Sequence, residues 1–282
     1  MMQLLHEIAP LRAALRAMRL DGAGRVAFVP TMGALHEGHL ALVKTARQHA
    51  DAVVVSIFVN PLQFGVGEDF SRYPRNTARD AALLESVGTD LLFLPTEAML
   101  FPQGQAAQTR VEVPGLSDVL CGAVRPGHFV GVSTIVSKLF NLVQPDVALF
   151  GEKDFQQLTI LRRMTADLNF NLEIIGHPTE READGLAMSS RNAYLSAEER
   201  ARAPMLYTTL KLMAEQLHLG RTDFERLEAE GRASLLASGL VPDYVAIRRV
   251  EDLAAPSSAT EPLVVLIAAR LGQTRLIDNI RV

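Results

Sequence analysis

Short apolar runs alternate with amphipathic segments over the first 176 residues of the chain. The runs are rich in β-branched side chains and predict strands at residues 25–29, 52–58, 90–94, 147–150 and 172–175. The segments between them repeat apolar residues with helical spacing, which predicts helices at residues 40–50, 77–87, 132–142 and 155–168. Strands that are almost continuously apolar belong to a parallel sheet covered on both faces. The expected fold is therefore α/β, with a Rossmann-like doubly wound parallel sheet.

The remainder of the chain has a different order of elements. Its predicted elements are two helices followed by three strands: residues 197–217 and 223–238, then 244–249, 263–269 and 274–282. Helices followed by neighbouring strands indicate a smaller α+β domain with an antiparallel pair or triplet of strands. We expect the boundary near His177, which gives domains at residues 1–176 and 177–282.

Composition narrows the class of protein. The chain has 282 residues, 48% of them apolar, and 28 basic against 32 acidic residues give a net charge of −4. Neither half is strongly basic, so a nucleic-acid partner is not expected. The single cysteine, Cys121, excludes an internal disulfide and a cysteine-based zinc site. The amino-terminal residues lack the pattern of a signal peptide, and no apolar run approaches the roughly 20 residues that span a bilayer. We expect a cytoplasmic protein without a membrane segment.

Two histidines stand where a predicted strand gives way to a predicted helix, in Val29-Pro-Thr-Met-Gly-Ala-Leu-His-Glu-Gly-His39. At positions i and i+3, His36 and His39 should share one face of the first helical turn. The unpaired N–H groups and the helix dipole favour an anion there, and Gly33 and Gly38 allow the backbone to approach it. These features suggest a nucleotide α-phosphate. A metal site, which needs at least one more ligand, and a plain helix cap are the alternatives.

Two further segments carry groups suited to a nucleotide. Gly151, Lys153 and Asp154 follow a predicted strand and offer a backbone turn, a cation for phosphate and a carboxylate for ribose. The serines and arginine of Met188-Ser-Ser-Arg-Asn192 can bind β- and γ-phosphates. Taken alone, the first segment also fits an ordinary charged turn, and the second a surface turn.

Two more segments carry polar groups of less definite purpose. Asn60 and Gln63 follow a predicted strand, where Gln63 can orient a small polar substrate and Asn60 can hold the turn. Residues 65–75 are charged and fit either a lid or an ordinary loop. Arg125 and His128, in a glycine-bounded turn, can bind a carboxylate or brace the site. Segments that follow parallel strands should converge at the carboxyl edge of the sheet.

The familiar nucleotide loops, Gly-x-x-x-x-Gly-Lys-Ser/Thr and Gly-x-Gly-x-x-Gly, are absent. The motifs that are present occur in one order and closely resemble the pantoate–β-alanine ligase family across nearly the whole chain. They are Val29-Pro-Thr-Met-Gly-Ala-Leu-His-Glu-Gly-His39, Asn60-Pro-Leu-Gln-Phe64, Arg125-Pro-Gly-His-Phe129, Gly151-Glu-Lys-Asp154 with Gln157, and Met188-Ser-Ser-Arg-Asn192.

The resemblance implies a nucleotidylyl-transferase fold related to class I aminoacyl-tRNA synthetases, and a homodimer. It also implies a two-step reaction. The carboxylate of (R)-pantoate attacks the α-phosphate of Mg-ATP to give pantoyl adenylate and pyrophosphate, and the amine of β-alanine then displaces AMP to give pantothenate. No acidic cluster indicates a protein metal site, so Mg²⁺ should be held mainly by phosphates and water.

The resemblance also assigns residues. It implies that His36, His39 and Lys153 act in catalysis, that Gln63 binds pantoate and β-alanine, and that Gln157 binds pantoate, with Asn60 as a secondary contact. The implied ATP-binding residues are Met32, Gly33, Ala34, Leu35, His36, Glu37, Gly38, His39, Gly151, Glu152, Lys153, Asp154, Glu180, Met188, Ser189, Ser190 and Arg191. Glu180 departs from the family pattern, which has an apolar residue near adenine, and a side chain facing adenine would reduce nucleotide affinity.

Two other functions fit parts of the pattern. One is an adenylyl transferase of the same fold that acts on a phosphorylated acceptor and forms no AMP. The other is an inactive module that senses ATP, against which the retention of both histidines, Lys153 and the Ser-Ser-Arg segment argues.

Overall fold

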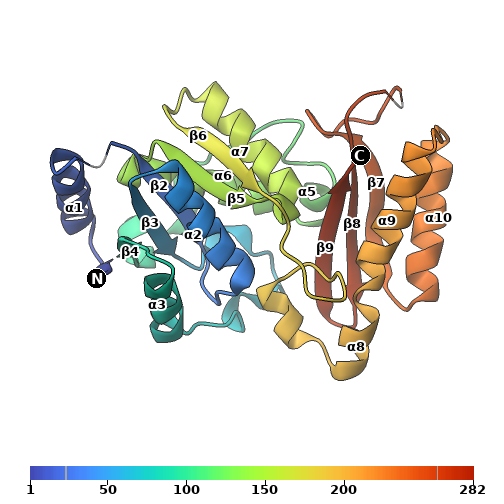
Figure 1. Ribbon diagram of the computed structural model, residues 1–282, viewed down its shortest axis with the longest axis horizontal. Helices are drawn as coiled ribbons and strands as arrows, with labels where there is room; N and C mark the ends of the chain where they lie inside the picture. The colour runs from blue at the N-terminus through green and yellow to red at the C-terminus, as the bar shows by residue number, and fades with distance from the viewer. Residues whose placement is uncertain (23, 259) are drawn as a thin grey trace. The chain divides into compact units, whose positions relative to one another are not determined.

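The computed structural model describes residues 1–22, 24–258 and 260–282, which form two compact units (Figure 1). The first unit comprises residues 1–152 and 160–178, and the second comprises residues 153–159 and 179–282. The segment that carries Lys153 and Gln157 therefore groups with the carboxyl-terminal part of the chain. The division at residue 176 remains a prediction.

The first unit is built on a six-stranded parallel sheet with the order β1-β4-β3-β2-β5-β6. The strands are β1 (Gln3–Leu5), β2 (Val26–Thr31), β3 (Ala52–Ile57), β4 (Leu91–Phe93), β5 (Val147–Gly151) and β6 (Glu173–His177). The predicted α/β fold is confirmed. Five of these strands coincide with the apolar runs of the sequence.

Helices cover both faces of this sheet. Neighbouring side chains of β2 point to opposite faces, and each face packs against different helices. Ala27 and Val29 pack in a buried cluster with side chains of α2 (Glu37–His49) and α3 (Thr77–Ser86). Phe28 instead meets Phe140 of α6 (His128–Val143), with ring centroids 6.5 Å apart. The other α-helices among the described residues up to 170 are α1 (Ile8–Leu20), α4 (Glu97–Leu100), α5 (Cys121–Val124) and α7 (Phe155–Asp167).

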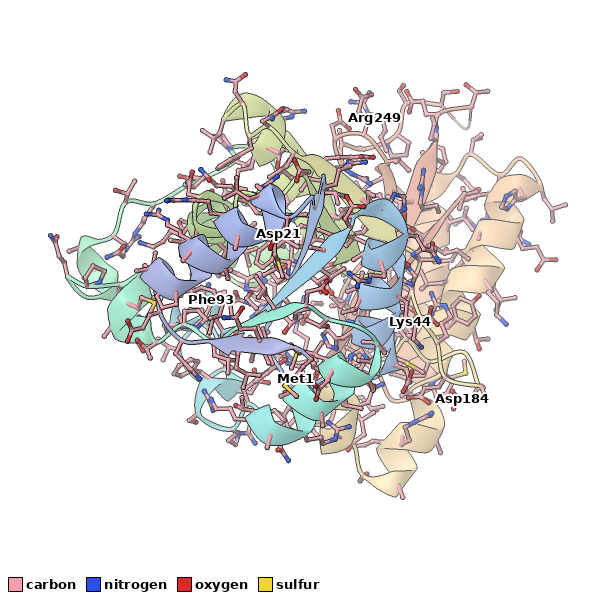
Figure 2. The ribbon with its side chains drawn as sticks, turned by 60° about the vertical axis from the view of Figure 1, so that its left-hand side comes forward. Met1, Asp21, Lys44, Phe93, Asp184 and Arg249 are labelled. Carbon is pink, nitrogen blue, oxygen red and sulfur yellow. The ribbon has the colours of Figure 1, made fainter. Side chains whose placement is uncertain are left out.

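The sequence pattern did not predict β1 or α1. Strand β1 has only three residues, two of them exposed, and it gains its conformation by pairing with β4. Helix α1 buries only Leu11 and Leu15 and ends at Leu20, with Asp21, labelled in Figure 2, as its C-cap. Strand β1 therefore depends on its pairing with β4, whereas Leu11 and Leu15 of α1 stand four residues apart, a helical spacing that the sequence analysis overlooked.

The second unit contains a three-stranded antiparallel sheet with the order β7-β8-β9, as predicted. Its strands are β7 (Val241–Arg249), β8 (Leu263–Leu271) and β9 (Thr274–Arg281). Helix α9 (Met205–His218) packs on β8 and β9, and α10 (Phe224–Ala237) packs on β7 and α9 (Figure 1). Leu206, Leu210 and Ile267 belong to its fully buried core.

The prediction of one helix over residues 197–217 was wrong. The chain forms two helices there, α8 (Ala197–Arg202) and α9, and Pro204 occupies the N-cap of the second. Proline has no N–H for the helical ladder and clashes with the preceding turn, so it ends one helix and begins another.

Candidate active site

The two histidines form the start of α2. His36 is the N-cap, with extended backbone, and His39 lies in the first turn, so the expectation that both stand on the helix was wrong by one residue. Their rings remain neighbours, with centroids 4.2 Å apart. The pair therefore lies at the positive end of the helix, as the sequence predicted.

The backbone contacts of this pair orient both rings. The Nδ1 atom of His36 accepts a hydrogen bond from the Gly38 N–H at 3.2 Å, and the Nδ1 atom of His39 accepts from the His36 N–H at 3.4 Å. Because Nδ1 is an acceptor in each ring, a neutral ring carries its proton on Nε2. Each histidine thus holds an Nε2–H donor of the kind that stabilises negative charge on a phosphate.

A buried carboxylate holds the turn that precedes His36. Asp80 of α3 is 1% exposed, and its oxygens accept hydrogen bonds from the backbone N–H groups of Ala34 and Leu35 at 2.8 and 3.0 Å. Gly33 has φ of +78°, and a Cβ atom there would lie 3.1 Å from the Asp80 carboxylate. The sequence analysis missed Asp80. Its spacing of four residues from the buried Leu84 is the signal that places it on the inner face of α3.

The Asn60–Gln63 turn follows β3 and lies beside the histidine segment. Asn60 accepts a hydrogen bond from the Leu62 N–H at 3.3 Å and donates to Gln63 Oε1 at 3.0 Å, while Gln63 Nε2 donates to Met32 Sδ at 3.1 Å. Asn60 also donates to the carbonyl of Gly131 at 3.1 Å. A Cβ on Gly131 would lie 2.3 Å from the Leu62 carbonyl oxygen, so only glycine lets the turn rest on α6.

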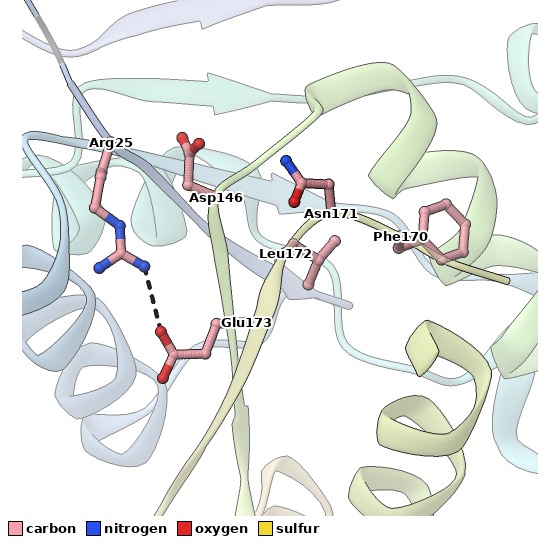
Figure 3. A pocket seen from close by; sticks show the side chains of 6 residues that line it. All are labelled: Arg25, Asp146, Phe170, Asn171, Leu172 and Glu173. Carbon is pink, nitrogen blue, oxygen red and sulfur yellow. Dashed lines mark hydrogen bonds and ion pairs between the residues drawn. The ribbon is translucent and has the colours of Figure 1, made fainter. Parts of the chain in front are cut away.

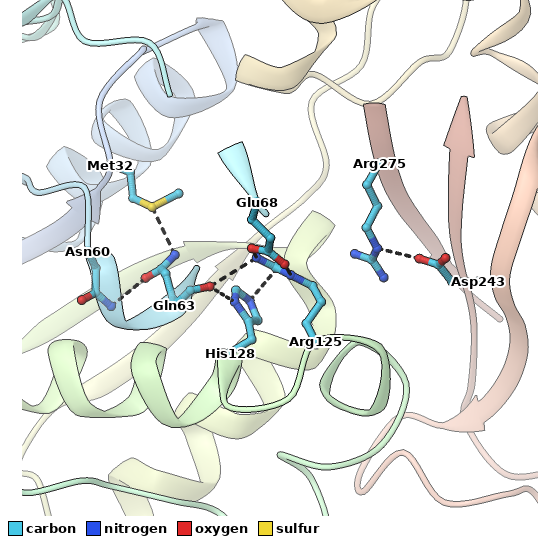
Figure 4. A network of polar contacts seen from close by, with 8 residues as sticks. All are labelled: Met32, Asn60, Gln63, Glu68, Arg125, His128, Asp243 and Arg275. Atoms are coloured by element: carbon cyan, nitrogen blue, oxygen red, sulfur yellow. Dashed lines mark hydrogen bonds and ion pairs between the residues drawn. The ribbon is translucent and has the colours of Figure 1, made fainter. Parts of the chain in front are cut away.

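Arg125 and His128 brace this same turn (Figure 4). His128 is the first residue of α6, and its Nδ1 lies 2.7 Å from the Gln63 carbonyl oxygen, to which Arg125 also donates. Arg125 makes two hydrogen bonds to Glu68, at 2.7 and 2.5 Å. Burial alone would raise the pKa of Glu68, but the hydrogen bond and charge of Arg125 outweigh it and hold that pKa below its ordinary value. Glu68 thereby fastens residues 65–75 at one point, and their role as a lid remains a prediction.

Gly151 and Glu152 complete the candidate site residues of the first unit. Gly151 ends β5, the parallel neighbour of β2, so it lies at the same carboxyl edge of the sheet as Met32. Glu152 begins the short turn Glu152–Asp154.

The remaining candidates lie in the second unit. The Lys153 carbonyl accepts a hydrogen bond from the side-chain amide of Asn279 at 2.9 Å, and Asp154 and Gln157 follow Lys153 in the same segment. The Glu180 carbonyl accepts from the Met188 N–H at 2.9 Å, which closes a hairpin. After it, the Ser189 hydroxyl accepts from the Arg191 N–H at 3.3 Å and caps the turn Ser190–Tyr194.

An open pocket of about 400 Å³ lies at the opposite edge of the first unit's sheet (Figure 3). Its lining residues precede or begin β2, β5 and β6, where Arg25 pairs with Glu173 at 3.3 Å. Ligands of parallel α/β sheets bind beyond the carboxyl ends of strands, and the predicted site residues of the first unit lie at that edge. We therefore assign the candidate site to the carboxyl edge and not to this pocket.

Within the described ranges, no three histidine, cysteine, aspartate or glutamate side chains are grouped so that they could hold a metal ion. None of the helices in the described part of the chain has the length and apolar character needed to cross a membrane.

Known proteins resemble this chain over its whole length. Residues 3–281 match the profile of the Pantoate-beta-alanine ligase family. The Pantothenate synthetase of Photobacterium profundum is 56% identical over 99% of this chain and 94% of its own. That of Pseudomonas putida is 54% identical over 100% and 98%.

Solved structures agree with these sequences. The pantothenate synthetase of Thermus thermophilus superposes with a TM-score of 0.92 and 49% identity, covering 99% of both chains. The pantoate-beta-alanine ligase of Francisella tularensis, complexed with Beta-gamma ATP and Beta-alanine, has a TM-score of 0.78 and 32% identity over 99% and 97% of the chains. A fold, a set of ordered motifs and full-length relatives agree, and the chain belongs to the pantoate–β-alanine ligase family.

Proposed function

We propose that this chain condenses (R)-pantoate with β-alanine at the expense of ATP, through a pantoyl adenylate. In the first step a pantoate carboxylate oxygen attacks the α-phosphorus of ATP, and the bond to pyrophosphate breaks. In the second step the β-alanine amine attacks the acyl carbon, loses a proton and displaces AMP, which leaves pantothenate. The orientation of His36 and His39 at the start of α2 carries this proposal.

The first step brings a carboxylate toward a triphosphate, so its transition state gathers negative charge. We assign the Nε2–H groups of His36 and His39, together with the helix dipole, to the phosphates that the attack makes more negative. Lys153 and Arg191 supply formal positive charge, and Ser189 and Ser190 supply hydroxyl donors. Lys153 is assigned to a phosphate and Asp154 to the ribose.

Pantoate and β-alanine need orientation in the site more than they need charge stabilisation. We assign pantoate to Gln63 and Gln157, and β-alanine to the neighbourhood of Gln63. Asn60 is assigned as a secondary contact, and its hydrogen bond to Gln63 at 3.0 Å supports a place beside the substrates. Holding both reactants in line for attack contributes several kcal/mol, on the order of the entropy lost in a bimolecular encounter.

The nucleotide is assigned to residues 32–39, 151–154 and 188–191, with Glu180 as a further contact. The Glu180 carbonyl is already bonded to Met188. We propose that Mg²⁺ arrives with ATP and is held by phosphate and water oxygens, that the protein works in the cytoplasm, and that two copies form a homodimer.

The test is product analysis. The purified protein is incubated with Mg-ATP, D-pantoate and β-alanine, each omitted in turn, and nucleotides and products are followed by mass spectrometry. AMP and pantothenate should appear only in the complete mixture, with pyrophosphate formed from ATP and pantoate alone. Intact nucleotide in every mixture, from folded protein, would favour an ATP sensor, and pyrophosphate release onto a phosphorylated acceptor would favour the other adenylyl transferases.

A further inference from the structure

We propose that Asp278 and Asn279, on the last strand, are positioning residues that hold the two segments of the second unit assigned to ATP. The inference rests on the proposed function, because it takes the assignment of Lys153 and of residues 188–191 to the nucleotide as its starting point. Neither Asp278 nor Asn279 belongs to the residues implied by the family motifs.

The two residues are neighbours on β9, so their side chains leave the strand on opposite faces. They pair with Ile267 and Leu266 of β8, the middle strand of the sheet. Both are buried, with exposures of 3% for Asp278 and 6% for Asn279. Polar side chains that are buried on a strand require hydrogen-bond partners. The partners of Asp278 and Asn279 identify what these two residues hold in place.

Asp278 holds the hairpin that runs from Glu180 to Met188. Its two carboxylate oxygens accept hydrogen bonds from both terminal nitrogens of Arg181, at 2.7 and 3.0 Å. Arg181 also donates to the Gly185 carbonyl at 3.1 Å, and its guanidinium lies 3.7 Å from the centroid of the Tyr207 ring. A paired and stacked arginine fixes the direction of the hairpin that leads into Ser189.

Asn279 holds the Lys153 segment. Its side-chain amide donates to the Lys153 carbonyl at 2.9 Å, a bond that spans 126 residues.

Burial raises the pKa of Asp278, while its bonds to Arg181 and the nearby positive charge of Lys153 act in the opposite direction. The two neighbouring residues thus hold the backbone of Lys153 and the guanidinium of Arg181.

One short piece of β9 therefore sets the positions of two phosphate-binding segments that the sequence separates by about thirty residues. Loss of the Asn279 amide should release the Lys153 segment and weaken ATP binding, with little effect on pantoate held at Gln63. A role confined to folding would instead lower stability and leave ATP affinity unchanged.

The experiment compares Asn279→Leu with Asp243→Asn as the matched control. Asp243 pairs with Arg275 at 2.7 Å on the same sheet (Figure 4), and neither residue is assigned to ATP. Calorimetry measures the dissociation constant of a non-hydrolysable ATP analogue, steady-state kinetics gives KM for ATP and pantoate, and thermal unfolding gives Tm.

We expect Asn279→Leu to raise the dissociation constant for the analogue and KM for ATP roughly five- to tenfold, which is the scale of one lost hydrogen bond, and to leave KM for pantoate within about twofold. Asp243→Asn should lower Tm without changing either ATP value. Asn279→Gln, which retains the amide donor, should recover part of the affinity. If Asn279→Leu does not fold, the smaller Asn279→Ala also removes the donor without adding a charge and carries the same expectation.

Unchanged ATP affinity in a folded Asn279 variant that lacks the amide donor, or an equal change in the Asp243 control, overturns the proposal. Wild-type protein that does not bind the analogue overturns the proposed function instead, so the two failures are distinguishable.

Discussion

The histidine turn and the Lys153 segment are both predicted to bind phosphate but are assembled in different ways. The bonds that orient His36 and His39 span two and three residues. The bonds that hold Lys153 and Arg181 reach β9 over 126 and 97 residues. A motif of the first kind can form wherever a strand meets a helix, whereas one of the second kind exists only after the carboxyl-terminal sheet has folded.

The contrast is not complete, because the histidine turn also has one distant support. Asp80 reaches the turn from 46 residues away and binds the N–H groups just before His36. Both regions therefore combine residues visible in a motif with a buried polar residue outside it. The difference lies in how much of the geometry survives without that residue.

The largest expected effect lies on Lys153. Lys153→Ala should slow pyrophosphate release from ATP and pantoate by about 10²–10³-fold, because the transition state loses a positioned charge. The measurement is a pyrophosphate assay on protein whose circular dichroism matches the wild type. Lys44→Ala, an exposed lysine on α2 labelled in Figure 2, is the control and should leave the rate unchanged. A near-normal rate from folded Lys153→Ala protein would remove Lys153 from catalysis.

Asp80 tests how far the histidine turn depends on its distant support. Asp80→Ala leaves two backbone N–H groups without their buried acceptor, so the free energy of unfolding should fall by about 2–4 kcal/mol. Urea unfolding measures this value. Asp21→Ala, at the exposed end of α1, should change it by less than about 0.5 kcal/mol. An equal loss of unfolding free energy in the two variants would contradict the proposal that Asp80 holds the histidine turn.

Two glycines of the predicted ATP segments sharpen the comparison further. Gly33→Ala places a Cβ 3.0 Å from Ile57 at φ of +78°, so the free energy of unfolding should fall by about 1–3 kcal/mol. At Gly151, no heavy atom of the described residues other than its chain neighbours lies within 4 Å of the new Cβ. Gly151→Ala should therefore change stability by less than about 0.5 kcal/mol. Thermal unfolding of both variants measures these changes. A larger loss of stability in Gly151→Ala than in Gly33→Ala would refute the explanation from backbone geometry.

The smallest effect concerns the bond between Glu68 and Arg125. Because the folded pKa of Glu68 lies below its ordinary value of 4.5, the stabilisation is present above pH 4.5 and is lost as the pH falls through the folded pKa. The Tm difference between the wild type and Glu68→Gln should therefore shrink below pH 4.5. A gap that stays constant from pH 7 to pH 3 would show that the charge of Glu68 contributes nothing.

The sequence predicted elements where side-chain chemistry and periodicity agreed. The apolar runs of β2, β3 and β5 and the histidines at the start of α2 needed no tertiary information. The spacing of Asp80 from Leu84 indicates the inner face of α3 but not the turn that Asp80 binds. Arg181 and Asn279 could not be found in this way, because a single polar residue in a strand or loop has the same local pattern whether it is buried or exposed. The two-part helix at Pro204 was missed although the proline was visible.

By itself, the sequence determined the fold class, the family and the nature of the chemistry, since periodicity, motif order and the identity of reactive groups are all properties of the linear chain. Only the tertiary structure decided that Asp80 closes the histidine turn and that β9 holds Lys153 and Arg181. The physical reason is that a hydrogen bond depends on position within about half an ångström. Residues far apart in sequence reach that precision only when packing has fixed both of them.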